Sequence, residues 1–298
     1  MKTSTLFLTL GVLAIARHAA TAAPSYSVDW DVATSGGGSS SGGTFAVWDV
    51  VGQADAGELS GGTFSLNSGQ MSRPGLAGFQ TRVVSGGRRI FYNGSSLDGA
   101  SAAANASDDA ALATDKSALL PGGTATFANV TSHPSGITGI MIDVEALPEA
   151  LTEADIQVKA GNSQSPGSWT NVVSPTITLR RGAGSDGSDR VTLAWPGGVL
   201  QNQWLQATIK ATPQSGIDSD DVFYFGSSIG DVGDSSSNFA VNSIDVTSTR
   251  LNVAFSQVPV TSPYDIDRDG RVNSTDVTLV RLNLSVVPSR ALVRLVAP

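Results

Sequence analysis

Twelve residues near the C-terminus occur twice, and this duplication constrains the fold more than any other feature of the chain. Residues 241–252 and 272–283 lie 31 residues apart and are identical at nine of twelve positions. Because chance rarely produces such a match, we interpret the copies as two units of one supersecondary structure. The segment from residue 229 to residue 298, which contains both units, is therefore predicted to be a module of its own.

A run of acidic residues leads into the second copy. Residues 265–276, called loop two below, place acids at positions 1, 3, 5 and 12 and a glycine, Gly270, at position 6. Alternate side chains of such a loop converge on one centre, and the glycine permits the sharp turn, which is the spacing of a calcium-binding loop. The predicted Ca²⁺ ligands are Asp265, Asp267, Asp269 and Asp276, together with the backbone carbonyl of Arg271.

The first copy retains this pattern only in part. Counted without gaps, its corresponding positions are Asp234, Ser236, Asn238, Ala240 and Asp245, and Phe239 replaces the glycine. Two carboxylates in place of four predict a weak calcium site or none at all.

A short amphipathic helix is expected to follow each loop. After loop two, apolar residues stand at 277, 279, 280 and 282, and the helix is predicted to begin at Asn273 or Ser274. The helices expected from the repeat cover residues 243–252 and 274–283. No helix is expected before loop two.

Two tandem loop–helix units, with Asp at position 12 and no entering helix, resemble a type I dockerin module. The resemblance covers about 50 residues, and residues 265–276 lie close to that family's signature. It implies calcium in each loop and docking onto a cohesin-like protein or another cell-surface component. It also implies that the module attaches its carrier, often a polysaccharide hydrolase, to a scaffold. By position, the implied contact residues are Ser243, Ile244, Arg250, Ser274, Thr275 and Arg281.

The remainder of the chain is typical of β structure. Residues 86–228 contain six segments in which apolar and polar residues alternate, at 139–145, 155–159, 176–180, 190–195, 204–210 and 221–225. Turn residues separate them, which predicts a β-sandwich. Residues 23–85 are rich in Gly and Ser and repeat Ser-Gly-Gly-Thr-Phe, so we expect small β-hairpins there. The predicted class is mainly β, a β-sandwich with a small α-helical module at the C-terminus.

The N-terminus has the pattern of an export signal. Lys2 precedes an apolar run too short to span a bilayer, and Ala20-Thr21-Ala22 is a suitable cleavage site. We expect a signal peptide at residues 1–22, a secreted or cell-surface protein, and no membrane span in the mature chain. Loss of Lys2 and Arg17 takes the net charge from −8 to −10. Such an acidic chain is a poor partner for nucleic acid.

The sequence favours a non-catalytic protein over an enzyme. The chain has no cysteine, and His133 is the only histidine outside the signal peptide, where we interpret it as a solvated loop residue. Asp143 and Glu145 lie on one face of one strand, which is the wrong arrangement for a glycosidase pair. The alternative is a role in polysaccharide degradation, as a glycoside hydrolase or by carbohydrate binding. The candidate sugar contact is Trp169, in a turn sequence.

Overall fold

The computed structural model describes residues 81–285 and 291–298 and, before residue 81, five short strands. The chain divides into two compact units, Met1–Ala77 and Gly78–Pro298. In the first unit, β2 (Gly37–Gly42) pairs with β3 (Phe45–Val50), and β4 (Glu58–Gly61) pairs with β5 (Phe64–Asn67), both antiparallel. β1 (Ser27–Val28) joins β2. These pairings agree with the hairpins expected from the repeated Gly-Gly-Thr-Phe sequence. The predicted signal peptide lies outside the described residues.

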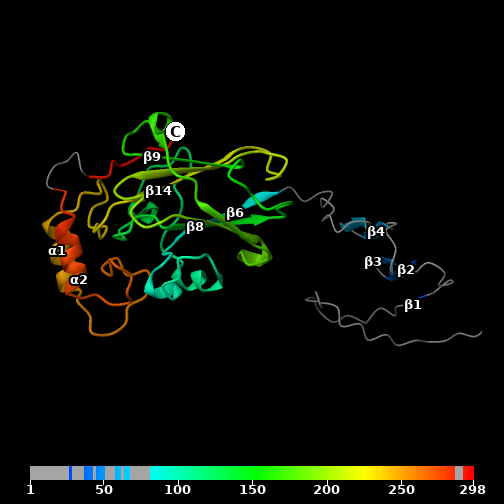
Figure 1. The fold of residues 1–298 in the computed structure, drawn as a ribbon, viewed down its shortest axis with the longest axis horizontal. Helices are drawn as coiled ribbons and strands as arrows, with labels where there is room; N and C mark the ends of the chain where they lie inside the picture. The colour runs from blue at the N-terminus through cyan, green and yellow to red at the C-terminus, as the bar shows by residue number, and fades with distance from the viewer. Residues whose placement is uncertain are drawn as a thin grey trace, which may run out of the picture. The chain divides into compact units, whose positions relative to one another are not determined.

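Two sheets make residues 81–298 mainly β, as the sequence predicts (Figure 1). The first sheet has five strands, in the order β10 (Thr170–Asn171), β9 (Ile156–Gly161), β13 (Trp204–Ile209), β14 (Asp221–Ser227) and β7 (Val130–Thr131). The second has four antiparallel strands, in the order β11 (Thr176–Arg180), β12 (Asp189–Ala194), β8 (Gly139–Glu145) and β6 (Arg82–Phe91). Residues 81–227, which contain both sheets, are called the β body below.

The six predicted strands are all present, with ends shifted by two residues at most. The first strand of the body, β6, lies across the domain boundary expected at residue 85. Its two halves pair with β8 in different registers, because the ladder is interrupted between Val83 and Arg88. Gly86 lies in this interruption with a φ of 69°, a backbone conformation that glycine adopts without strain.

One buried core draws side chains from both sheets. Ile140, Ile142 and Val144 alternate along β8 and point into it, and Leu205, Ala207 and Ile209 do the same from β13. Figure 1 shows β6 and β8 on one side of the body and β9 and β14 on the other. Each buried aliphatic or aromatic side chain contributes about 1.5–3 kcal/mol. This core is the main source of stability in the β body.

Short 3₁₀ helices connect the strands. They are η1 (Ser96–Asp98), η2 (Ala106–Ala111), η3 (Phe127–Asn129), η4 (Pro166–Ser168) and η5 (Ser185–Gly187). Asn105 caps η2: its side chain accepts a hydrogen bond from the Ser107 N–H at 2.7 Å.

The duplicated sequence forms the two α-helices, α1 (Ser243–Leu251) and α2 (Ser274–Leu282). Both begin directly after an asparagine cap, Asn242 or Asn273, so the starts predicted from the repeat are confirmed. In each case an aspartate at the third helical position, Asp245 or Asp276, accepts a hydrogen bond from the cap's N–H at 2.8 Å. Figure 1 shows the two helices side by side.

The C-terminal tail packs back onto the β body. Leu292, Leu295 and Ala297 are buried in a second core that includes Trp204 of β13. The indole N–H of Trp204 donates to the carbonyl of Val293 at 2.8 Å. The tail is thus a packing segment, buried against the β body.

Candidate metal centre

Loop two brings three of its four acids together. One carboxylate oxygen from each of Asp265, Asp267 and Asp276 lies within 4.8 Å of the others. Asp265 and Asp276 are fully buried, at 0% exposure. Two buried carboxylates beside a third acid form a compact oxygen cluster, which is the chemistry that a hard divalent cation requires.

Backbone amides hold these carboxylates in place. Asp276 accepts hydrogen bonds from the N–H of Ile266 at 2.7 Å and from that of Asn273 at 2.8 Å. Asp265 accepts from the N–H of Gly270 at 3.0 Å. Gly270 has a φ of 85°, so the turn at position 6 requires glycine, as the loop spacing predicts.

The cluster is electrostatically unfavourable without a cation. Burial, followed by repulsion from neighbouring acids, raises the pKa of Asp265 to about 6 and raises that of Asp267 as well. The Arg268 guanidinium offsets part of this for Asp265. The donor set, its burial and its excess negative charge therefore fit a calcium ion.

The fourth acid, Asp269, lies outside this cluster of three carboxylates. Asp269 is exposed, and its carboxylate accepts hydrogen bonds from the N–H of Arg271 at 2.8 Å and from the Asn273 side chain at 3.4 Å. The Arg271 side chain is exposed. Ligation by the Asp269 side chain and by the Arg271 carbonyl stays a prediction.

The first unit contains a similar cluster of three acids. Its first acid stands three residues before the position that the ungapped repeat aligns with Asp265. Its acids are Asp231, Asp234 and Asp245, with carboxylate oxygens within 4.8 Å of one another. The N–H of Val232 donates to Asp245 at 3.1 Å, just as Ile266 donates to Asp276 in loop two. By this hydrogen-bond pattern Asp231, and not Asp234, corresponds to Asp265. The first loop, called loop one below, therefore covers 15 residues, 231–245, against 12 in loop two.

Ligation by the other expected residues of the first unit, Ser236, Asn238 and the carbonyl of Ala240, stays a prediction. Ser236 and Asn238 are exposed, and the side-chain Oδ1 of Asn238 accepts a hydrogen bond from the N–H of Ala240 at 3.0 Å. Phe239 is buried at 2% exposure, with its ring 6.1 Å from that of Trp204. The three extra residues allow the chain to place this phenylalanine in the core of the body. An alignment that allowed a gap before Asp234 is the sequence signal that would have identified Asp231.

Asp231 has the most perturbed environment in loop one. It is 1% exposed, and its Oδ2 atom has no hydrogen-bond partner among the described residues. Burial, followed by the nearby Asp245 and Asp234 carboxylates, raises its pKa to about 7. An orphaned carboxylate oxygen facing two other acids fits a cation ligand.

The residues that the resemblance implies for docking lie on the surface. Ser243, Ile244 and Arg250 of α1, and Ser274, Thr275 and Arg281 of α2, are all exposed. Apolar side chains accompany them: Ile244 is 58% exposed, and Leu251 and Leu282, equivalent positions of the repeat, are 79% and 76% exposed. The sequence analysis missed these leucines, although each stands one residue after a predicted contact arginine. The helix pair therefore carries an exposed surface that is partly apolar.

Two aromatic residues lie in the interior and not in solvent. Trp169 is 6% exposed, packs against Tyr224 at 6.0 Å between ring centroids, and donates its indole N–H to Ser163. Its ring is not available to stack on a sugar. His133 is 6% exposed, so its interpretation as a solvated residue is wrong. Burial lowers the pKa of His133 to about 3, which keeps it neutral.

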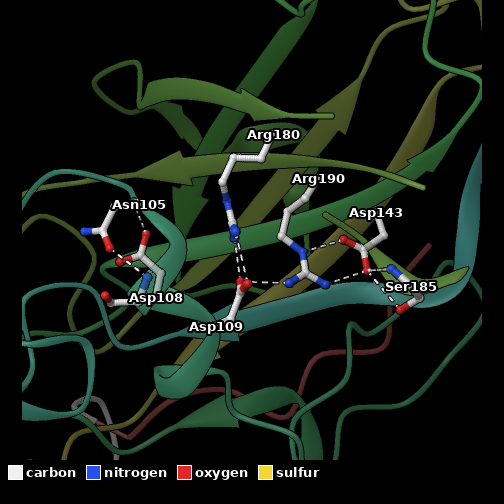
Figure 2. A network of polar contacts seen from close by, with 8 residues as sticks. Asn105, Asp108, Asp109, Asp143, Arg180, Ser185 and Arg190 are labelled. Carbon is white, nitrogen blue, oxygen red and sulfur yellow. Dashed lines mark hydrogen bonds and ion pairs between the residues drawn. The ribbon is translucent and has the colours of Figure 1, made fainter. Parts of the chain in front are cut away.

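Several acids of the β body form ion pairs with arginines. Figure 2 shows Asp143 facing Arg190, which also contacts Asp109, and Arg180 on the far side of Asp109. A pocket of about 270 Å³ is lined by Asp218, Asp220 and Asp221. Asp221 is paired with Arg88, and Asp220 accepts a hydrogen bond from the backbone N–H of Ala211. These contacts fit structural roles better than general acid–base chemistry.

Comparison of the chain with protein-family models, with curated proteins and with solved structures finds no match. Among the described residues, no helix has the length and apolar character needed to cross a bilayer.

Proposed function

We propose that this is an exported, non-catalytic protein in which a β-sandwich body carries a calcium-binding, dockerin-like module for attachment to another protein. The observation that carries the proposal is the convergence of Asp265, Asp267 and Asp276 in a loop whose following helix is duplicated in sequence and in structure. Each part of the proposal draws on a separate property of the described residues.

Calcium is the cation that suits loop two best. Ca²⁺ takes six to eight oxygen ligands in flexible geometry, and the loop offers aspartate carboxylates with carbonyls and water to complete the shell. The chain has no cysteine, and its one buried histidine lies outside both clusters, so softer metals lack their usual ligands. Bound calcium would supply the positive charge that the buried acids lack.

The chain's own residues then order the module. Asp276 accepts hydrogen bonds from Ile266 and Asn273, and thereby ties the start of loop two to the start of α2. Asp245 makes the equivalent contacts with Val232 and Asn242 in loop one. Metal affinity and folding of the module are coupled through these shared carboxylates.

The exposed faces of α1 and α2 are the proposed attachment surface. They combine exposed arginines with the apolar side chains of Ile244, Leu251 and Leu282, a composition common at protein interfaces. A cohesin-like protein is the partner class that the resemblance favours. For the alternative, a role in polysaccharide degradation, the described residues provide no specific support, because Trp169 is buried and Asp109, Asp143 and Asp221 are paired with arginines.

Titration calorimetry and thermal unfolding of the mature chain, with calcium and with EDTA, test the metal site. Free calcium at 100 times its dissociation constant stabilises the folded state by about 2.7 kcal/mol. At about 2–4 °C per kcal/mol for a domain of this size, Tm rises by about 5–11 °C. Absence of both binding heat and a thermal shift at millimolar calcium contradicts the proposal.

Matched variants place the effect in loop two. Asp276→Asn removes one ligand charge and keeps one acceptor oxygen for the Asn273 N–H at the start of α2, so we expect weaker calcium binding from a folded protein. Asp186→Asn makes the same charge change at an exposed position with a φ of 54°, which asparagine tolerates, and leaves binding unchanged. For attachment, binding to an immobilised cohesin should require calcium and be lost with Ile244→Asp. Binding that resists both changes contradicts the proposed surface.

A further inference from the structure

Arg268 occupies an unexpected place for a residue in the middle of a metal-binding loop. It stands at position 4 of loop two, between Asp267 and Asp269, where an arginine is expected to extend into solvent. Instead it is 2% exposed and is one of the largest fully buried side chains among the described residues. Burying a guanidinium is costly unless its surroundings provide specific partners.

The β body provides those partners from three separate segments. The guanidinium carbon lies 4.7 Å from the ring centroid of Tyr92, a cation–π contact. Its Nη2 donates to the hydroxyl of Ser132 at 3.2 Å. The Ser96 hydroxyl donates to the backbone carbonyl of Arg268 at 3.0 Å. Tyr92 and Ser132 are themselves buried, at 1% and 0% exposure, so the arginine reaches the interior of the body.

The loop also holds its own arginine. Nη1 of Arg268 donates to the carbonyl of Ser262, three residues before the first predicted ligand. The backbone of Arg268 has a φ of 58°, in the left-handed region, which costs a non-glycine residue about 1–2 kcal/mol. Nη1, Nη2 and the face of the guanidinium have partners, whereas Nε is buried and has no hydrogen-bond partner among the described residues.

We propose that Arg268 is a positioning residue for the cation site of loop two. It anchors the loop in the β body, so that cation binding in the loop and the stability of the body are energetically coupled. This inference rests on the proposed calcium site. Because Arg268 is flanked by Asp267 and Asp269, movement of its backbone displaces both neighbours. Conversely, a loop closed around its cation holds the arginine in the body.

Charge alone predicts the opposite change in calcium affinity when Arg268 is replaced, so the direction of that change tests the proposal. A guanidinium close to a bound dication repels it, so removing the positive charge should tighten calcium binding. If Arg268 acts by positioning the loop, removing it weakens binding in spite of the favourable change in charge. Groups that support metal ligands from outside the ligand set typically change affinity by about 10–100-fold.

Calorimetry with Ca²⁺ on the mature chain and on matched variants distinguishes the two effects. We expect Arg268→Met to weaken calcium binding by at least tenfold, in line with the magnitude for supporting groups. The control is Arg82→Met, which removes the same charge from an exposed position of the β body and should leave calcium binding unchanged. Ser132→Ala changes only the body, 133 residues before Asp265 in the sequence, and is expected to weaken binding by a smaller factor.

Unfolding followed by tryptophan fluorescence provides the second measurement. Trp195 and Trp204 are buried in the body, at 2% and 0% exposure, and report its unfolding. Calcium should raise the body's Tm in the native chain and raise it less in Arg268→Met. Far-ultraviolet circular dichroism establishes that this variant is folded, and Ser132→Ala serves in its place if it is not.

The outcomes separate this inference from the proposed function. If the native chain does not bind calcium, both fail. If it binds calcium and both Arg268→Met and Ser132→Ala bind as tightly or more tightly, the proposed metal site stands and the positioning role is refuted. Weaker binding by both variants, with unchanged binding by Arg82→Met, supports the coupling.

Discussion

The ion pair of Arg190 and Asp143 links neighbouring strands on the outer face of the four-stranded sheet (Figure 2). The guanidinium donates to the two carboxylate oxygens at 2.7 and 2.9 Å, and the Ser185 N–H donates to the same carboxylate at 3.0 Å. Asp143 is 2% exposed and Arg190 8%. Burial raises the pKa of Asp143, but hydrogen bonds from Arg190 and Ser185 outweigh this, so that its pKa lies below the usual value.

The perturbation is Arg190→Met, which keeps most of the side chain's length and removes its charge. Asp143 is then buried with Ser185 as its remaining partner. Removing one member of a buried pair costs about 3–5 kcal/mol, because the other charge stays desolvated. Loss of the contact from Arg190 to Asp109 adds little to the decrease in stability. The Asp109 side chain is 40% exposed and keeps its ion pair with Arg180. At about 2–4 °C per kcal/mol, we expect Tm to fall by about 6–20 °C.

The assay is calorimetric unfolding at pH 7 with calcium present, together with a double variant and a surface control. Arg190→Met/Asp143→Val removes both charges, and we expect it to recover at least half of the lost stability, because an apolar pair can replace a buried ion pair. Arg82→Met breaks the pair with Glu145, which joins β6 to β8 in the same sheet. Because the Arg82 side chain is 71% exposed, this variant should leave Tm unchanged. An Arg190→Met variant as stable as the native chain, or a double variant less stable than the single one, refutes this reasoning.

Three further predictions concern single residues. The pKa of His133 is about 3 in the folded chain and near 6.5 in the unfolded chain. The neutral, buried imidazole therefore contributes fully to folding stability above pH 6.5, and this contribution is lost as pH falls towards 3. When the pH falls from 6.5 to 5, the free energy of unfolding of the native chain should decrease by about 2 kcal/mol more than that of His133→Gln, as measured by denaturant titration. Equal decreases would contradict the burial argument. Gly270→Ala has room, since the nearest atom to an added Cβ is a side-chain carbon of Gln257 at 3.6 Å, so the cost of about 1–2 kcal/mol comes from the φ of 85° and should appear as weaker calcium binding. Asp231→Asn should reduce the calcium stoichiometry from two to one in calorimetry, whereas Ser236→Ala should not; two ions bound by Asp231→Asn would remove Asp231 from the ligand set.

Local sequence signals account for the elements that were predicted well. An asparagine cap followed three residues later by aspartate defines the start of α1 and of α2, because that pair satisfies the first amides of the helix. Strands such as β8 and β13 follow from the alternation of Ile140, Ile142 and Val144, or of Leu205, Ala207 and Ile209. In both cases the information lies within about ten residues.

The features that were missed depend on residues far apart in the chain. Gly86 and Gly87 resemble a turn in sequence, yet β6 continues through them because β8 pairs with both of its halves. His133 occupies a turn-like sequence but lies 5.3 Å from Tyr92, which follows a different strand. Asp231 aligns with Asp265 only when a gap is allowed, and the reason for the gap is the packing of Phe239 in the core of the body. Tertiary packing decided each of these positions.

The burial of the tail at Leu292 and Leu295 has a mechanical consequence. The helix pair is joined to the β body on its N-terminal side by β14 and the residues after it, and on its C-terminal side by a tail that is packed against Trp204. A partner pulling on α1 and α2 would therefore load the body along two routes at once, so that neither strand β14 nor the tail need bear the whole tension.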